Sequence, residues 1–175
     1  EIVANLQADG LLNSTVVIWT TDHGDGLPRA KRAVSDTGLL VPLVLRWPDK
    51  IGAGQLDTRL VSVVDLAPSI LQLAGIEVPA FVQGQAMLNT VVTRDYVFAG
   101  RDRMDAIPDH VRAARDQRYK YIRNYQADLS YFRPLAFRDM FPVMQALWQA
   151  KAADTLTEQQ GFYFTAPRPL EELYD

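Results

Sequence analysis

Two continuous apolar runs stand out in the first half of the chain. Residues 15–21, TVVIWTT, are mostly β-branched or aromatic, and residues 41–47, VPLVLRW, have the same character. Strands that are covered on both faces lack an alternation of polar and apolar positions, and they are typical of parallel sheets flanked by helices. The pattern therefore predicts two buried strands of a mostly parallel sheet. The polar segment that joins them is about twenty residues long, and loops of that length without structure of their own are usually functional or disordered.

Helical spacing of apolar residues marks two further segments. Residues 1–9 predict the tail of an amphipathic helix, with Gly10 as a left-handed cap. Residues 62–75 predict a second helix, because an apolar stripe runs along them between an N-cap at Asp65 and an end at Gly75. Helices that alternate with buried strands indicate an α/β fold class.

Short runs separated by charged or turn residues follow later in the chain and predict an antiparallel meander of strands. These runs are residues 95–102, 110–116 and 118–125. Residues 137–153 predict a helix that is interrupted or kinked near Pro142, and residues 157–164 predict one more helical turn. We therefore expect residues 1–92 to be part of an α/β core and residues 93–175 to form a smaller C-terminal subdomain.

The composition narrows the range of functions. Of the 175 residues, 48% are hydrophobic, which indicates a packed core. The absence of cysteine excludes a disulfide framework, a thiolate metal site and a thiol nucleophile within these residues. The net charge of −3 gives no argument for nucleic acid or an anionic membrane as partner, and no apolar run approaches the ~20 residues of a membrane span. Because the chain starts at Glu1 inside a helical pattern, we expect it to be part of a longer protein.

A carboxylate and an imidazole stand side by side where the first predicted strand ends. Ligands of parallel α/β sheets bind beyond the carboxyl ends of the strands, which is where Asp22 and His23 lie. Gly24 and Gly26 permit the backbone to bend so that both side chains reach one cation. Two ligands cannot complete a metal shell, since Ca²⁺ takes about 6–8. Taken alone, the pair is compatible with a metal site or with an ordinary polar turn.

Several blocks in a fixed order carry a resemblance to a known family. They are TTDHG, then Lys31 at eleven positions before Pro42 of VSDTGLLVPLVLRWP, then VSVVDLAPSILQLAGIEVP, and finally PLEELYD. In this order the blocks resemble the sulfatase family of the alkaline phosphatase superfamily. The stretch RDYVFAGRDRMDAIPDHVRAARDQRYKYIRNY looks most like the C-terminal lobe of the N-sulfoglucosamine sulfohydrolase (heparan N-sulfatase) branch. The resemblance covers nearly the whole chain and implies an alkaline-phosphatase-like fold, of which this chain would be the C-terminal portion.

The resemblance also implies roles for particular residues. Asp22 and His23 would be ligands of a divalent metal, most often Ca²⁺ in the family, although a nitrogen ligand also suits other divalent metals. Lys31 would contact a sulfate oxygen and stabilise charge on the departing group. The family's nucleophile is a formylglycine made from Cys or Ser in a C/S-x-P-x-R motif, which this chain lacks and which we expect upstream. Leu40 stands where the family usually has arginine, so the chain is expected to carry about half of an active site.

A second group of polar residues is expected to line the substrate pocket. In the resembled branch, the C-terminal lobe edges that pocket, and arginines there could hold the sulfates or carboxylates of an acidic sugar by paired hydrogen bonds. The alternative is a set of alternating charges on the wet face of a hairpin, with His110 as a surface histidine. Arg29 is a further candidate, because it takes the place of Lys31 if the loop register differs. The candidates in the C-terminal half are Arg101, Arg103, Asp105, His110 and Arg112.

Three functions remain open from the sequence. The first is part of a metal-dependent sulfatase that hydrolyses sulfate esters or sulfamates, with a sulfated small molecule or sugar as substrate. The second is a phosphodiesterase or phosphonate monoester hydrolase of the same superfamily. The third is a catalytically inactive fragment or interaction module, since the nucleophile motif is absent. We expect the isolated chain to hydrolyse neither ester type, and the sequence assigns no oligomeric state or compartment.

Overall fold

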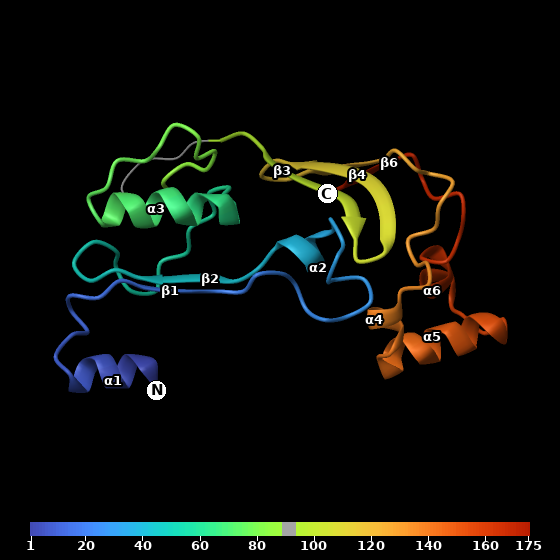
Figure 1. Cartoon of the computed structure of the whole chain (residues 1–175), viewed down its shortest axis with the longest axis horizontal. Helices are drawn as coiled ribbons and strands as arrows, with labels where there is room; N and C mark the ends of the chain where they lie inside the picture. Colours follow the sequence, from blue (N-terminus) through green and yellow to red (C-terminus); the bar gives the residue numbers. More distant parts are fainter. Residues whose placement is uncertain (89–93) are drawn as a thin grey trace. The chain divides into compact units, whose positions relative to one another are not determined.

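The computed structural model describes residues 1–88 and 94–175, which form two compact units (Figure 1). Unit 1 comprises Glu1–Asp57 and unit 2 comprises Thr58–Asp175. The domain boundary predicted between residues 92 and 93 lies outside the described residues and stays a prediction.

Unit 1 consists of two short helices and a two-stranded sheet. The helix α1 spans Ile2–Ala8, and the strands β1 and β2 span Val17–Thr20 and Leu43–Arg46. These elements confirm the predicted helix and the positions of the two predicted strands. The prediction that both strands are buried is wrong, since Trp19 and Val44 are more than half exposed. Gly10 follows α1 with a φ of 72°, the left-handed conformation expected of its cap. A four-residue helix, α2 (Asp36–Leu39), interrupts the long segment between the strands.

The two strands of unit 1 pair with each other in antiparallel register. Val17 lies opposite Arg46 and Thr20 lies opposite Leu43. For this pair, the prediction of parallel strands is wrong. A continuous apolar run indicates that both faces of a strand are suited to burial, but it carries no information about the direction of the neighbouring strand.

Unit 2 begins with a helix that is anchored by a buried carboxylate. The 3₁₀ turn η1 (Val63–Asp65) leads into α3 (Leu66–Leu73), and Gly75 follows with a φ of 70°. Asp65 is fully buried, but its side chain does not cap α3. It accepts hydrogen bonds from three donors instead, each at 2.8 Å: the Ser62 and Gln85 amides and the Arg94 guanidinium. The sequence thus predicted the helix start correctly and the task of its carboxylate incorrectly.

Ser69 extends this anchor by one turn of α3. Its buried hydroxyl donates to the Asp65 carbonyl at 2.5 Å and accepts from the Met87 amide at 2.9 Å. Since residues 76–88 contain no helix or strand, these side-chain contacts replace the backbone ladder that would otherwise hold the segment.

Replacing Ser69 with alanine should therefore lower the free energy of unfolding of unit 2 by about 1–3 kcal/mol, because the buried Met87 amide loses its acceptor. Urea unfolding measured by circular dichroism tests this. Ser14→Ala is the matched control, since the Ser14 hydroxyl is exposed and donates to the carbonyl of Leu11, three positions before it in the chain. Equal effects of the two substitutions would contradict the anchoring role of Ser69.

The larger part of unit 2 is a four-stranded antiparallel sheet in the order β3-β4-β5-β6. The strands β3 (Val97–Met104), β4 (Ile107–Arg115) and β5 (Lys120–Asn124) confirm the predicted meander. The strand β6 (Glu171–Tyr174) was not predicted and pairs with β5. Its sequence, EELY, is short and mostly acidic, so only the tertiary pairing with β5 identifies it as a strand.

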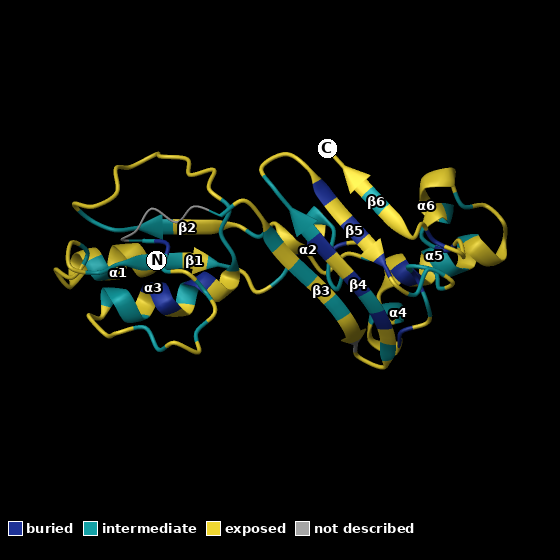
Figure 2. Ribbon diagram, turned by 90° about the horizontal axis from the view of Figure 1, so that it is seen from above, coloured by how far each residue is buried: buried dark blue, intermediate teal, exposed yellow. Residues whose placement is uncertain are grey.

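Buried positions alternate with less buried ones along β4 and β5 (Figure 2), so the sheet has one covered face and one open face. Residues alternate along β4 and β5, so that Val111, Ala113 and Ile122 are buried on the covered face. Tyr121 and Leu173, which are cross-strand neighbours on the open face, are exposed. This alternation sorts the charged residues of the meander into two groups with different surroundings.

Three helices and an aromatic core complete unit 2. The helices are α4 (Ala136–Asp139), α5 (Pro142–Ala152) and α6 (Glu158–Phe162). Pro142 occupies the first position of α5, where its missing N–H costs no helical hydrogen bond, so the interruption predicted there is confirmed. Phe132, Met144 and Phe164 form the core cluster. None of the described helices is long and apolar enough to cross a membrane.

Candidate functional site

The loop after β1 places Asp22 and His23 as neighbours with converging side chains. The Nδ1 atom of His23 lies 2.6 Å from the Gly24 carbonyl oxygen. Because a carbonyl only accepts, Nδ1 is the donor, and the lone pair of a neutral His23 ring resides on Nε2. That Nε2 atom lies 3.5 Å from a carboxylate oxygen of Asp22. A carboxylate oxygen and an imidazole lone pair therefore sit next to each other.

This geometry suits a shared cation. Two ligand atoms at about 2.0–2.6 Å from one ion lie roughly 3–3.5 Å apart when they are adjacent in its shell. The hydrogen bond from Nδ1 to a carbonyl is the contact that commonly orients a metal-binding histidine. The Asp22 side chain is 88% exposed, so it is accessible to an ion from solvent. Within residues 1–88 and 94–175, no three His, Cys, Asp or Glu side chains gather as a metal shell, so Asp22 and His23 would supply part of one.

Close backbone packing holds this loop in shape. The Gly24 amide donates to the Gly38 carbonyl at 3.1 Å, which joins the DHG turn to α2. A Cβ at Gly24 would lie 2.9 Å from the Gly38 Cα and closer still to the Thr37 carbonyl oxygen. Glycine at position 24 is thus required by the close approach of another backbone segment, in addition to the bend that the sequence indicated.

Gly24→Ala should lower the free energy of unfolding of unit 1 by about 1–3 kcal/mol, since the obstructing atoms are backbone and cannot rotate away. Gly26→Ala is the matched control, because a Cβ there meets nothing within 4 Å. Denaturant unfolding followed by tryptophan fluorescence measures the loss, since two of the three tryptophans, Trp19 and Trp47, belong to unit 1. Similar losses for both variants would show that close packing is not what position 24 requires.

The same folded loop carries Lys31 and Arg29. The Lys31 amide donates to the Asp25 carbonyl at 3.0 Å, and the Arg29 carbonyl accepts from the Thr37 hydroxyl at 3.0 Å. Ala30 between them is buried. The backbone at these two positions is therefore fixed from both sides, and Lys31 belongs to the same ordered loop as Asp22 and His23.

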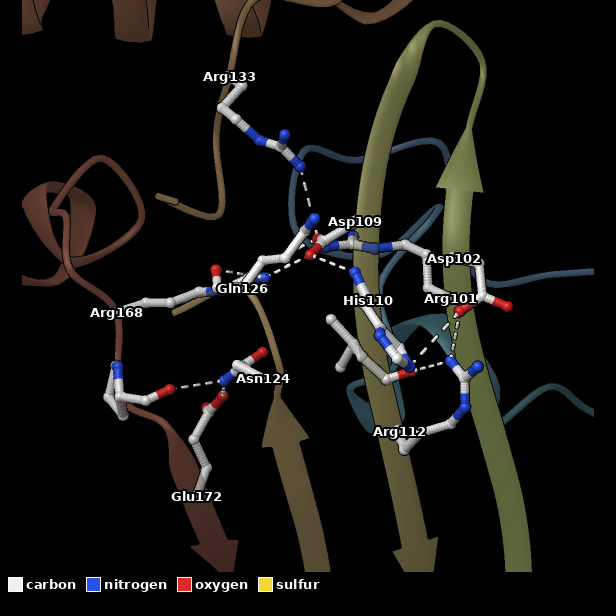
Figure 3. Close-up of polar contacts among 12 residues, drawn as sticks. Arg101, Asp102, Asp109, His110, Arg112, Asn124, Gln126, Arg133, Arg168 and Glu172 are labelled. Atoms are coloured by element: carbon white, nitrogen blue, oxygen red, sulfur yellow. Dashed lines mark hydrogen bonds and ion pairs between the residues drawn. The ribbon is translucent and has the colours of Figure 1, made fainter. Parts of the chain in front are cut away.

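The candidates of the C-terminal half do not form one group. Arg101 lies on the covered face of the sheet and pairs with the buried Asp109. His110 and Arg112 lie on the open face, and Asp102 lies between them (Figure 3). Arg103 and Asp105 belong to the end of the β3–β4 hairpin, where Arg103 Nε donates to the Asp105 carbonyl at 3.1 Å.

The open-face group consists of exposed, paired charges. Arg112 lies 2.7 Å from Asp102, and His110 Nε2 lies 4.0 Å from the same carboxylate. The hydrogen bond from Arg112 holds the pKa of Asp102 below its ordinary value. The His110 ring stacks on Tyr125 with 4.3 Å between the ring centroids. These contacts are compatible with a polar and aromatic surface for a substrate and equally with a solvated hairpin face, so the substrate role of His110 and Arg112 stays a prediction.

A buried carboxylate on the covered face was missed by the sequence analysis. Asp109 is 4% exposed and pairs with Arg101, Arg133 and Arg168 (Figure 3). Burial alone would raise the pKa of Asp109, but hydrogen bonds and charges of Arg168 and Arg101 outweigh this and hold it below its ordinary value. Arg168 lies 59 positions from Asp109 in the chain, so no local sequence motif predicts this ion pair.

Comparisons with known proteins agree with the motifs. The family model described as Sulfatase matches residues 1–76. An ulvan-active sulfatase from Formosa agariphila is 42% identical over 176 residues, which cover 99% of this chain and 30% of the relative. A second ulvan-active sulfatase from this organism is 33% identical over 183 residues, which cover 100% of this chain and 34% of the relative. The chain thus spans about a third of the length of these relatives.

The fold agrees as well. A solved structure described as a complex with its substrate, D-glucosamine-2-N,6-O-disulfate, superposes with a TM-score of 0.59 at 23% identity, over 93% of this chain and 37% of the other. This likeness shows the alkaline-phosphatase-like fold that the motifs implied. With the fold, the ordered motifs and the relatives in agreement, the chain belongs to the sulfatase family.

Proposed function

We propose that this chain is the C-terminal portion of a sulfatase and supplies the metal-binding and sulfate-binding loop of its active site. The observation that carries the proposal is the convergence of Asp22 and His23, 3.5 Å apart, on a loop that also holds Lys31. Sulfatases generally depend on a divalent metal, and the oxygen and nitrogen donors of this pair fit such an ion. Ca²⁺ is the metal we propose, since Asp22 offers a hard, charged oxygen ligand.

Each residue then has a defined task. When bound, the metal supplies positive charge that polarises a sulfate oxygen. Asp22 offsets part of that charge, and the Gly24 carbonyl keeps the proton of His23 on Nδ1 so that Nε2 is available as a ligand. The ammonium of Lys31 is a compact point charge, which suits stabilisation of an oxygen that becomes more negative as the S–O or S–N bond breaks.

We propose sulfated sugars as the substrate class. Two relatives are named for activity on ulvan, and one structural neighbour is described with a disulfated glucosamine. The arginines of the C-terminal half, including Arg103 and Arg112, are candidates for holding a further acidic group of such a sugar. In this proposal the nucleophile comes from a part of the protein that these residues do not include.

The experiment compares two ester types with an enzyme that contains this chain. Turnover of p-nitrophenyl sulfate and of sulfated oligosaccharides that exceeds turnover of a phosphate diester supports the proposal. Faster turnover of the diester would assign phosphodiester hydrolysis instead. Turnover by the isolated 1–175 chain would contradict the division of the site, because the chain would then contain its own nucleophile.

A further inference from the structure

Arg133 is a largely buried cation whose guanidinium makes no hydrogen bond to the residues that the structure describes. Its side chain is 20% exposed, and its terminal nitrogen lies 3.6 Å from an oxygen of Asp109, which is beyond hydrogen-bond distance (Figure 3). Its Nε atom is buried and has no hydrogen-bond partner among the described residues. A guanidinium carries five N–H donors, and buried donors normally find acceptors. Arg133 therefore needs an acceptor that these residues do not provide.

Asp109 does not meet this need, because its oxygens are already engaged. Both oxygens accept from the fully buried Arg168, one also accepts from Arg101, and the other accepts from the His110 amide at 2.8 Å. The Arg133 guanidinium approaches the carboxylate from the remaining side. It adds a further positive charge to a carboxylate that two guanidinium groups already neutralise.

The surroundings leave Arg133 charged but poorly compensated. Burial is the main cause that lowers the pKa of Arg133, and the charges of Arg168 and Arg101 lower it further; the negative charges of Asp109 and Asp128 act in the opposite direction without outweighing them. The backbone nearby is fixed, since the Arg133 carbonyl accepts from Arg138 at 2.6 Å. A fixed loop thus presents a partly accessible guanidinium edge next to surplus positive charge, which is the arrangement that binds an oxyanion.

We propose that Arg133 forms an oxyanion-binding site in unit 2 that takes a sulfate or carboxylate group. Both groups offer several acceptor oxygens to the planar guanidinium. Either one would compensate the positive charge of Arg133 that the single carboxylate of Asp109 does not neutralise. This site uses none of the residues of the loop 22–38, so it stands independently of the proposed hydrolytic function. Acidic sugars can carry sulfate groups, carboxylate groups or both. Separate titrations with a sulfate and with a carboxylate distinguish which of the two groups the site binds.

The test is a titration of the 1–175 chain observed through the Nε–Hε signals of its arginines in ¹⁵N-correlated NMR spectra. Sodium sulfate and sodium glucuronate are added in separate series at ionic strength matched with sodium chloride. We expect the Arg133 signal, assigned from its loss in Arg133→Lys, to shift in a saturable manner. Arg118 is the internal control, since its exposed side chain already pairs with Asp175 at 2.9 and 2.6 Å.

Saturation with sulfate assigns a sulfate site, and saturation with glucuronate alone assigns a carboxylate site. Equal, non-saturating shifts at Arg133 and Arg118 would indicate an adventitious ion only and would overturn the proposal, as would no shift at all. Arg133→Lys keeps the charge but loses the planar fork, so it should weaken binding by roughly tenfold or more, as measured by calorimetry. Unchanged affinity in a folded Arg133→Lys protein would remove Arg133 from the site.

Discussion

Lys31→Ala, introduced into a sulfatase that contains this chain, is expected to lower kcat for a sulfate ester by about 10²–10³-fold. The ammonium would act mainly on the negative charge that builds up during bond breaking, so its removal should affect kcat more than KM. Steady-state kinetics with p-nitrophenyl sulfate measure both constants. Lys31→Arg should recover only part of the rate, because a planar guanidinium does not reproduce a compact point charge.

Arg29→Ala is the control that decides the register of this loop. Arg29 and Lys31 lie two positions apart, and each has its backbone tied into the same fold by one hydrogen bond or more. If Arg29→Ala abolished turnover and Lys31→Ala did not, the assigned cation would be wrong while the proposed function would stand. If neither variant lost activity, neither Arg29 nor Lys31 would have a role in binding the sulfate group.

The sequence predicted those parts of the structure that depend on local patterns. The strand of residues 15–21 and the helix of residues 62–75 follow from β-branched runs, apolar stripes and a glycine with positive φ, all of which act within one segment. The pairing of Asp22 with His23 is also local, since the two residues are adjacent. Direction of pairing between β1 and β2 depends on partners outside each run, so the apolar pattern could not supply it.

Contacts between distant segments were the part that sequence patterns could not reveal. The buried carboxylate of Asp65 accepts hydrogen bonds from Gln85 and Arg94, which follow it by 20 and 29 positions in the chain. The strand β6 is defined by pairing with β5 across an intervening helical segment. Arg101 on β3 and Asp109 on β4 both lie on the covered face, and nothing in the sequence indicated that these two opposite charges would be buried together.

Asp109→Ala is expected to destabilise unit 2 by about 3–5 kcal/mol, the largest stability change that we predict. The substitution leaves Arg101, Arg133 and Arg168 together without the carboxylate that they share. Removing one partner of a buried ion pair is more costly than the pair's net contribution, because the remaining charges stay desolvated. Urea unfolding followed by circular dichroism measures the loss, and Asp109→Asn tests the charge with little change in volume.

The pH dependence gives the same carboxylate a second signature. The pKa of Asp109 is lower in the folded protein than in the unfolded chain, so its contribution is complete above the unfolded value of about 3.9 and is lost as the pH falls through the folded value. Wild-type protein should therefore lose stability below about pH 4 more steeply than Asp109→Asn, which has no proton to bind at this position. Asp102→Asn is the control from the open face of the same sheet, since Asp102 is 70% exposed and its pairing with Arg112 is screened by solvent. A wild-type acid transition with the same slope as that of Asp109→Asn would contradict the assignment of this stability to the buried carboxylate.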